Sequence, residues 1–171
     1  MGYLMDIIKN RRSIREFTAQ KIAPEIVDRL TEAMLWAPSA GNLQARRFYL
    51  VWNDKIKREL AEAAWQDFVA TAPLVVVGCT DNIIEKRYGD RGKNIYTICD
   101  VACAIQNLLL TAHAEELACA WVSAFDDKKV TKSLNLPTNL QPIALVPIGY
   151  SSAKPPAPPR LPKKDLFITV E

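Results

Sequence analysis

Hydrophobic and polar positions recur along the chain with two different periods, which predict helices interleaved with strands. A repeat near 3.6 residues predicts amphipathic helices, and four short or medium ones are expected over residues 4–10, 24–35, 54–65 and 126–134. Runs rich in β-branched and aromatic residues predict strands over residues 48–52, 74–79, 120–124, 143–150 and 166–170. The run over 74–79 is apolar throughout, as is typical of a strand buried on both faces.

The longest helical pattern covers residues 96–117 and is apolar almost all round, so we expect it in the middle of the molecule or in an interface. The polar segment 81–95 before it holds two glycines and is predicted as a loop. Pro147 inside the strand 143–150 predicts an edge strand or a bulge. Residues 154–162 are rich in proline and predict a stiff, extended arm from about residue 153.

Length and composition indicate one domain over residues 1–171 with an ordinary soluble composition. A net charge of +3 is too small to indicate nucleic acid as the main partner. We find no signal-type leader and no apolar run of the ~20 residues needed to span a bilayer, so we expect a cytoplasmic protein. The four cysteines lack the spacing of a metal or redox motif, and we expect buried structural thiols and no metal.

A basic stretch near the start, residues 11–17, holds three arginines and a serine directly after an apolar segment. Guanidinium groups are planar, permanently charged and present paired donors, which suits a phosphate. Taken alone, the stretch is better explained by a solvated basic patch on a surface helix.

Three later stretches change this interpretation: the loop 37–44, the helical pattern 100–110 and the close Pro159-Arg160-Leu161-Pro162. In this order and at these separations, they and the Arg-Arg-Ser-x-Arg-x-Phe stretch resemble the FMN-dependent nitroreductase family over essentially the whole chain. The resemblance implies an α+β fold with a central, mostly antiparallel sheet flanked by helices. It also implies an intertwined homodimer, in which the C-terminal arm reaches the partner and FMN lies at each subunit interface.

The resemblance further assigns cofactor-binding residues. Ser13 and the three arginines of the basic stretch would hold the FMN phosphate and flavin edge, with a contribution from Arg160. The loop 38–42 would reach the flavin from the partner subunit, and backbone near Ser123 and Ala124 would lie against the isoalloxazine ring. The full set of expected cofactor-binding residues is Arg11, Arg12, Ser13, Arg15, Pro38, Ser39, Ala40, Gly41, Asn42, Ser123, Ala124 and Arg160.

The chain departs from the common family pattern in two places. Gln44-Ala45-Arg46 stands where many relatives have Gln-Pro-Trp, and Ser123 stands where relatives carry an acidic residue. The segment before residue 95 leaves room only for a small lid, so an open site is expected. The tryptophans are expected mainly in the core, with Trp65 or Trp121 as candidates to line the pocket.

No residues form a conventional catalytic set, which agrees with a flavoenzyme in which the cofactor performs the chemistry. The predicted function is an NAD(P)H-dependent FMN oxidoreductase that reduces a nitroaromatic, quinone or similar small molecule by a ping-pong mechanism. Alternatives are a flavin enzyme of the same fold, performing oxygen-dependent flavin fragmentation or reductive dehalogenation, and a non-catalytic flavin-binding protein. A small nucleic-acid-binding domain is a further alternative, but it lacks a recognisable motif. We therefore expect neither a nucleic-acid nor a membrane partner.

Overall fold

A computed structural model describes residues 2–171, and its centre is a four-stranded antiparallel sheet. The strands are β1 (Arg46–Val51), β2 (Leu74–Asp81), β3 (Ala118–Cys119) and β4 (Leu140–Gly149), and their order in the sheet is β1-β2-β4-β3. The predicted α+β class and the mostly antiparallel sheet are confirmed.

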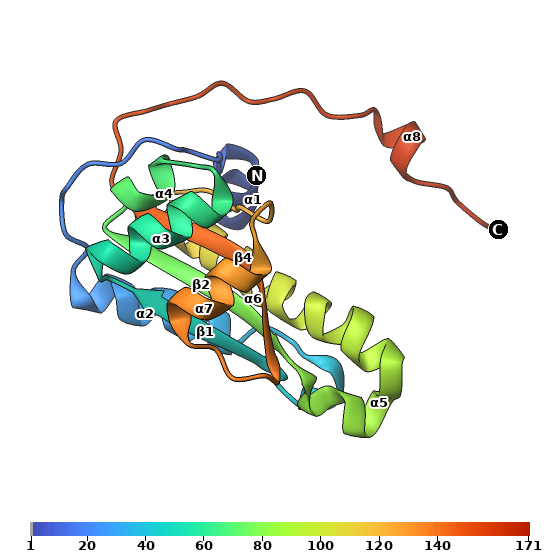
Figure 1. The fold of residues 1–171 in the computed structure, drawn as a ribbon. Coiled ribbons are helices and arrows are strands. Elements are labelled where there is room, and N and C mark those ends of the chain that lie inside the picture. The colour runs from blue at the N-terminus through green and yellow to red at the C-terminus, as the bar shows by residue number, and fades with distance from the viewer. Residues whose placement is uncertain (1) are drawn as a thin grey trace.

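Helices cover both faces of this sheet, giving three layers (Figure 1). One face packs against α2 (Pro24–Leu35) and the long α6 (Thr97–Ala114). The other face packs against α3 (Asp54–Ala64), the short α4 (Phe68–Thr71) and α7 (Asp127–Leu134). The N-terminal helix α1 (Tyr3–Asn10) contacts α6. All the helices predicted from the 3.6-residue repeat are present.

Strand β2 supplies apolar side chains to both layers, as its sequence predicts. Leu74 and Val76 lie in the core on the α2 and α6 side, whereas Val75 and Val77 lie in the core on the α3 and α7 side. Successive side chains of a strand point to opposite faces, so a strand covered on both sides needs apolar residues at every position.

The prediction of a loop over residues 81–95 is wrong. The segment forms a 3₁₀ turn (Asn82–Ile84), helix α5 (Glu85–Arg91) and one π-helical turn (Gly92–Tyr96) that runs into α6. Gly89 takes a φ of 54°, which breaks the helical path, and the buried side chain of Ile84 anchors the excursion. Its polar residues and glycines were therefore compatible with a short, mostly exposed helix.

Two strand predictions also need correction. The strand expected at 120–124 is β3 at Ala118–Cys119, followed by a single bridge between Val122 and Leu145. Strand β4 is an inner strand, so Pro147 does not mark an edge. The Pro147 carbonyl accepts a hydrogen bond from the Ala120 N–H (3.4 Å). Because the N–H and C=O of one strand residue point the same way, the missing proline N–H faces the short strand β3 rather than β2.

The C-terminal arm leaves the body of the molecule, as Figure 1 shows in red. It carries one helical turn, α8 (Lys163–Leu166), and residues 167–170 form no strand within the chain, contrary to the strand predicted there. The side chains of Phe167, Ile168 and Val170 are exposed, with Ile168 at 91%. A segment of strand composition thus has no strand partner in one chain.

By length and mean hydropathy, the helical stretch 82–114 reaches the threshold of a membrane span, which composition had not led us to expect. The core helix of a soluble protein meets the same threshold. In this fold α6 packs against the sheet and α2, and residues such as Val101, Ile105 and Leu108 are fully buried there. The hydropathy of α6 is explained by its place in the core.

Candidate functional site

The basic stretch leaves α1 in an extended form and runs beside β3. Ser13 forms a parallel bridge with Cys119, and the Ile14 N–H donates to the Cys119 carbonyl (3.0 Å). Further along, the Thr18 N–H donates to the Tyr150 carbonyl (2.8 Å). These backbone bonds fix the stretch against the sheet, so its arginines project from a held backbone rather than from a free tail.

The arginines of this stretch form a positive cluster with unused donors. Arg12 Nη1 donates to the carbonyls of Lys9 (2.7 Å) and Arg11 (2.8 Å), while Arg12 Nε is buried without a hydrogen-bond partner. Arg15 lies over the ring of Phe68, 5.8 Å from its centroid. Within residues 2–171, the ion pairs found include none of Arg11, Arg12 and Arg15. Positive charge and free donors are therefore available to an anion.

The C-terminal turn of α6 lies near the arginines of the basic stretch. Burial lowers the pKa of His113 below its ordinary value, and the charges of Arg11 and Arg12 lower it further. Burial raises the pKa of Cys119, although Arg11 opposes part of this rise. The structure thus brings the basic stretch, β3 and the last turn of α6 together around one concentration of positive charge.

The segment after β3 presents free backbone donors. Val122 exchanges two backbone hydrogen bonds with Leu145 (2.9 and 2.8 Å), and the Asp126 N–H donates to the Ala63 carbonyl (2.9 Å). Between these anchors, Ser123 and Ala124 are exposed, and in the described part of the chain no hydrogen bond from their N–H groups is found. The Ser123 hydroxyl accepts from Trp121 Nε1 (2.6 Å). This geometry suits backbone recognition of a polar ring edge.

The loop at Pro38–Asn42 is held from inside the protein by Asp100. The buried carboxylate of Asp100 accepts the Ala40 N–H through Oδ1 (2.9 Å), while its Oδ2 has no hydrogen-bond partner. Gly41 has a φ of 54°, and a side chain at this position would collide with the Tyr88 hydroxyl of α5. The loop is therefore a fixed turn braced between α5 and α6, rather than a flexible connection.

Arg46 is a second brace, which sequence reasoning did not identify. Its side chain is buried, with 6% of the residue exposed, and its two Nη atoms donate to four backbone carbonyls. The acceptors are Ala37 (2.7 Å), Pro38 (2.9 Å), Asp100 (2.9 Å) and Leu35 (3.3 Å). Burial lowers the pKa of Arg46, and the charges of Asp100 and Cys103 partly offset this effect. Arg46 thus ties the end of α2 and the loop to the start of α6.

Some predicted site residues are not brought together within one chain. Asp100, which holds the loop, lies in the first turn of α6, whereas His113, beside Arg11 and Arg12, lies in the last turn. The helical rise places about 20 Å between these two positions. Arg160 is exposed on the arm, where it donates to the carbonyls of Pro158 (3.4 Å) and Pro159 (3.1 Å).

Two predictions about side chains outside this set are wrong. Cys79 and Cys119 are buried, but Cys99 and Cys103 are exposed on α6. The tryptophans are not mainly core residues either, since Trp36, Trp52 and Trp65 are among the exposed large hydrophobic side chains. The apolar pattern of a helix or strand end does not tell which apolar residues the rest of the chain covers.

Comparison with known proteins gives the family. The model of the nitroreductase family matches residues 8–71 and 62–150. The FMN reductase (NADPH) of Bacillus subtilis is 26% identical over 182 residues, covering 98% of this chain and 73% of the relative. A NADH dehydrogenase of Thermus thermophilus is 28% identical over 181 residues, covering 89% and 88%.

A solved structure leads to the same conclusion. The NADPH:FMN oxidoreductase of Vibrio harveyi, determined in complex with NAD+, superposes with a TM-score of 0.90 at 26% identity, covering 98% of this chain and 77% of that one. The fold agrees with that of this neighbour, and the family model matches most of the chain: this chain belongs to the nitroreductase family.

Proposed function

We propose that this chain is an NAD(P)H-dependent oxidoreductase that binds FMN and reduces a small planar acceptor such as a nitroaromatic or a quinone. The observation that carries the proposal is the charge cluster of Arg11, Arg12 and Arg15, which has no carboxylate partner and leaves the buried Arg12 Nε free. A buried donor without a partner is costly, and a phosphate oxygen is an acceptor that removes this cost. Family membership and the reductases of FMN among the relatives support the same cofactor.

Different residues of the chain would bind different parts of FMN. Arg11, Arg12, Ser13 and Arg15 would bind its phosphate, because forked guanidinium donors match phosphate oxygens. The free N–H groups at Ser123 and Ala124 would orient the polar edge of its ring. Bound FMN supplies the hydride acceptance from NAD(P)H and the onward transfer of electrons, and the protein positions the ring and both substrates. We find no side chain that must act as an acid or base.

We further propose that the site is completed by a second copy of the chain. The loop 38–42 is about 20 Å along α6 from the basic cluster, too far to serve the same FMN within one chain. A homodimer lets the loop of one subunit meet the basic stretch of the other. Arg160 then has a function on an arm that leaves its own subunit, adding a charge to the partner's phosphate site.

We assign the arm to the open edge of β1 in the partner subunit. Within residues 2–171, strand β1 pairs only with β2, so its other edge is open. A groove of about 440 Å³ runs there between β1 and the end of α7, lined by apolar residues such as Tyr49, Ile56 and Leu134. The strand-forming residues 166–170 of a second subunit match this edge, since an added strand supplies the missing backbone hydrogen bonds.

The first test is whether the purified protein binds FMN and whether NAD(P)H reduces it. A protein that takes up FMN and is bleached anaerobically by NADH or NADPH, then recolours on addition of a quinone, supports the proposal. Protein that takes up no FMN contradicts it. FMN-loaded protein that neither nucleotide bleaches indicates a flavin-binding protein without this activity.

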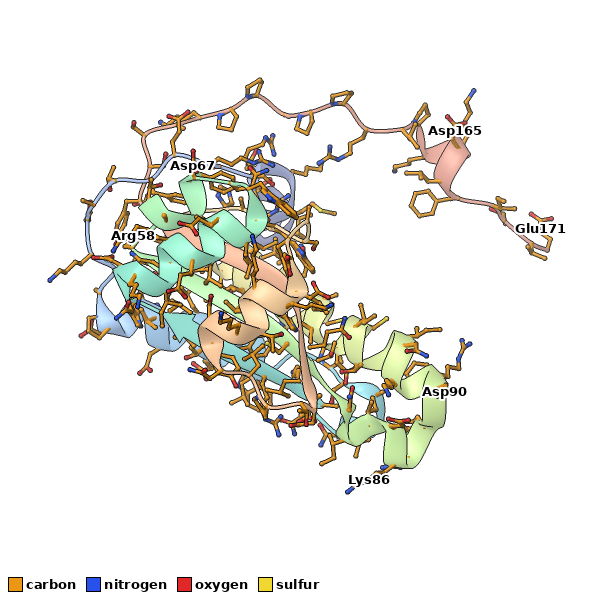
Figure 2. The ribbon with its side chains drawn as sticks, in the orientation of Figure 1. Arg58, Asp67, Lys86, Asp90, Asp165 and Glu171 are labelled. Atoms are coloured by element: carbon orange, nitrogen blue, oxygen red, sulfur yellow. The ribbon has the colours of Figure 1, made fainter. Side chains whose placement is uncertain are left out.

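A double substitution tests the phosphate assignment. Arg12→Ala with Arg15→Ala should weaken FMN binding at least tenfold, while riboflavin, which lacks the phosphate, should bind both proteins about equally. The matched control is Lys55→Ala with Arg58→Ala, which removes two exposed positive charges from α3 (Arg58 is labelled in Figure 2). Equal loss of FMN affinity in both variants would leave only a general effect of charge and refute the assignment.

A further inference from the structure

Trp65 combines an exposed aromatic ring with a strained backbone. It ends α3 in the left-handed conformation, with φ 52° and ψ 37°, and its N–H donates to carbonyls of the last helical turn. The Gln66 N–H then donates to the Ala61 carbonyl (3.0 Å), which completes a helix C-terminal motif in which glycine is the usual residue. A bulky residue with positive φ is an outlier, and the tryptophan is nevertheless 69% exposed.

Nothing in the core therefore explains why this position holds a tryptophan. A residue that is strained and exposed contributes little packing to offset the strain, and glycine would adopt the same backbone without cost. Such outliers collect at functional sites, where a side chain is needed in a particular place. The position of Trp65 in the fold is the second part of the evidence.

Trp65 stands in the chain between Ala63 and Phe68, and each of these two residues contacts one of the stretches to which we assign the flavin. On one side, the Ala63 carbonyl accepts the Asp126 N–H (2.9 Å), which ties the end of α3 to the segment of Ser123 and Ala124. On the other side, Phe68 lies under the guanidinium of Arg15. Asp67 marks this α3–α4 corner in Figure 2, and Phe17, Phe68 and Phe125 pack against the same core cluster.

We propose that Trp65 is a specificity-determining residue, whose indole forms a wall on which the planar ring of an aromatic acceptor stacks at the flavin site. This inference rests on the proposed function. Tryptophan supplies a large, rigid, apolar face at little entropic cost, and aromatic rings attract one another in stacked or edge-to-face contact. Because the excursion at α5 is short, we assign the preference for flat over compact acceptors to the indole wall instead.

Kinetics with two acceptors of different shape test the proposal. We compare a planar benzoquinone or nitrobenzoate with ferricyanide, a compact inorganic acceptor with no ring to stack. In the FMN-loaded dimer, Trp65→Gly should raise KM for the aromatic acceptor about three- to tenfold, with kcat changed much less, as expected for a lost aromatic contact. The KM for ferricyanide should stay the same, and Trp65→Phe should recover part of the effect.

Two measurements that do not depend on turnover accompany the kinetics. Binding of an unreactive ring, benzoate, to the oxidised FMN protein should weaken in Trp65→Gly to a similar extent. The thermal midpoint of Trp65→Gly should be equal to or above that of the natural chain, because glycine relieves the left-handed strain. Asn135→Gly is the matched control, since Asn135 ends α7 with φ 48° and ψ 46°, and its kinetics should not change.

The outcomes separate the two proposals. If the natural chain binds no FMN, the proposed function and this inference fail together. If it binds FMN and reduces both acceptors, but Trp65→Gly leaves the aromatic KM and benzoate binding unchanged, only the inference is refuted. Equal loss with both acceptors, a lowered thermal midpoint or loss of the dimer by sedimentation would assign Trp65 a structural role and overturn the inference as well.

Discussion

Replacing Arg46 by methionine tests whether one buried guanidinium holds the loop at Pro38–Asn42 in place. Methionine has a similar length and no charge, so it fills much of the space while removing every donor. The bonds to Ala37 and Asp100 are buried, whereas those to Pro38 and Leu35 are partly open to solvent. Water can therefore replace the guanidinium at two of the four carbonyls, but not easily at the other two.

The magnitude follows from the buried pair of carbonyls. Leaving a buried acceptor without its partner costs roughly 1–3 kcal/mol each. The Asp100 carboxylate, already short of one partner at Oδ2, also loses a neighbouring positive charge. Against this, methionine avoids the cost of taking a guanidinium out of water. We expect Arg46→Met to lower the free energy of unfolding by about 2–4 kcal/mol.

The assay is equilibrium urea unfolding followed by circular dichroism, with all proteins at one concentration because the stability of the proposed dimer would depend on concentration. Arg58→Met is the control, because it removes the same charged group from an exposed position of α3. It should cost less than about 0.5 kcal/mol, as surface substitutions usually do. An Arg46→Met variant within that range would show that the four hydrogen bonds contribute no net stability, and would refute the reasoning.

Two further predictions concern the arm and the pH dependence. Ile168→Asp should shift the sedimentation profile from dimer toward monomer, because a charge is costly in an apolar strand site. The control Asp165→Asn, on the same arm, should leave the profile unchanged. If Ile168→Asp also leaves the dimer unchanged, the arm is not part of the interface. The pKa of His113 is lowered in the fold, so the unfolded chain binds the proton first and stability should fall as the pH drops below about 6.5. His113→Gln should flatten this fall in urea midpoints, and parallel curves for the two proteins would contradict it.

Most of the fold could be predicted because its elements have a local cause. Helix α2 begins at a proline and repeats apolar residues on one face, and β2 is apolar from Leu74 to Val77 because both faces are covered there. Helices α3 and α7 are capped at their N-termini by Asn53 and Asp126, whose side chains accept N–H groups of the first turn. Each of these signals lies within a few residues of the structure that it specifies.

The errors arise where contacts with distant parts of the chain determine whether a segment forms a strand. Residues 120–124 have strand composition, but the pairing with β4 is used by Ala118–Cys119 and returns only at Val122. The arm residues 166–170 also have strand composition, and no free edge in the same chain pairs with them. Strand propensity states that a segment fits a pleated surface, not that a partner is present.

Arg46 and Asp100 show the same limit for the site. Arginine at the start of a strand and aspartate at the start of a helix both look like ordinary exposed charges, yet both are buried and hold the loop from within. The sequence did contain one signal of their burial: Arg46 and Asp100 each stand beside an apolar run. A charged residue within such a run must either reach solvent or find partners, and only the folded chain shows that Arg46 reaches the carbonyls of a turn it follows.

The two ends of α6 support the proposal that the flavin site of this chain is built from two subunits. Along the helix, Cys99, Cys103 and Gln106 are exposed at helical spacing, so one stripe of a largely buried helix is left uncovered by residues 2–171. A two-fold axis through the middle of this stripe would set two α6 helices antiparallel, because such an interface places the same patch on itself. The first turn of one helix, with its braced loop, would then lie beside the last turn of the other, with its cluster of arginines. The distance along α6 keeps the loop and the arginine cluster of one chain apart, and in the antiparallel pair it would place each of them beside its complement on the other chain.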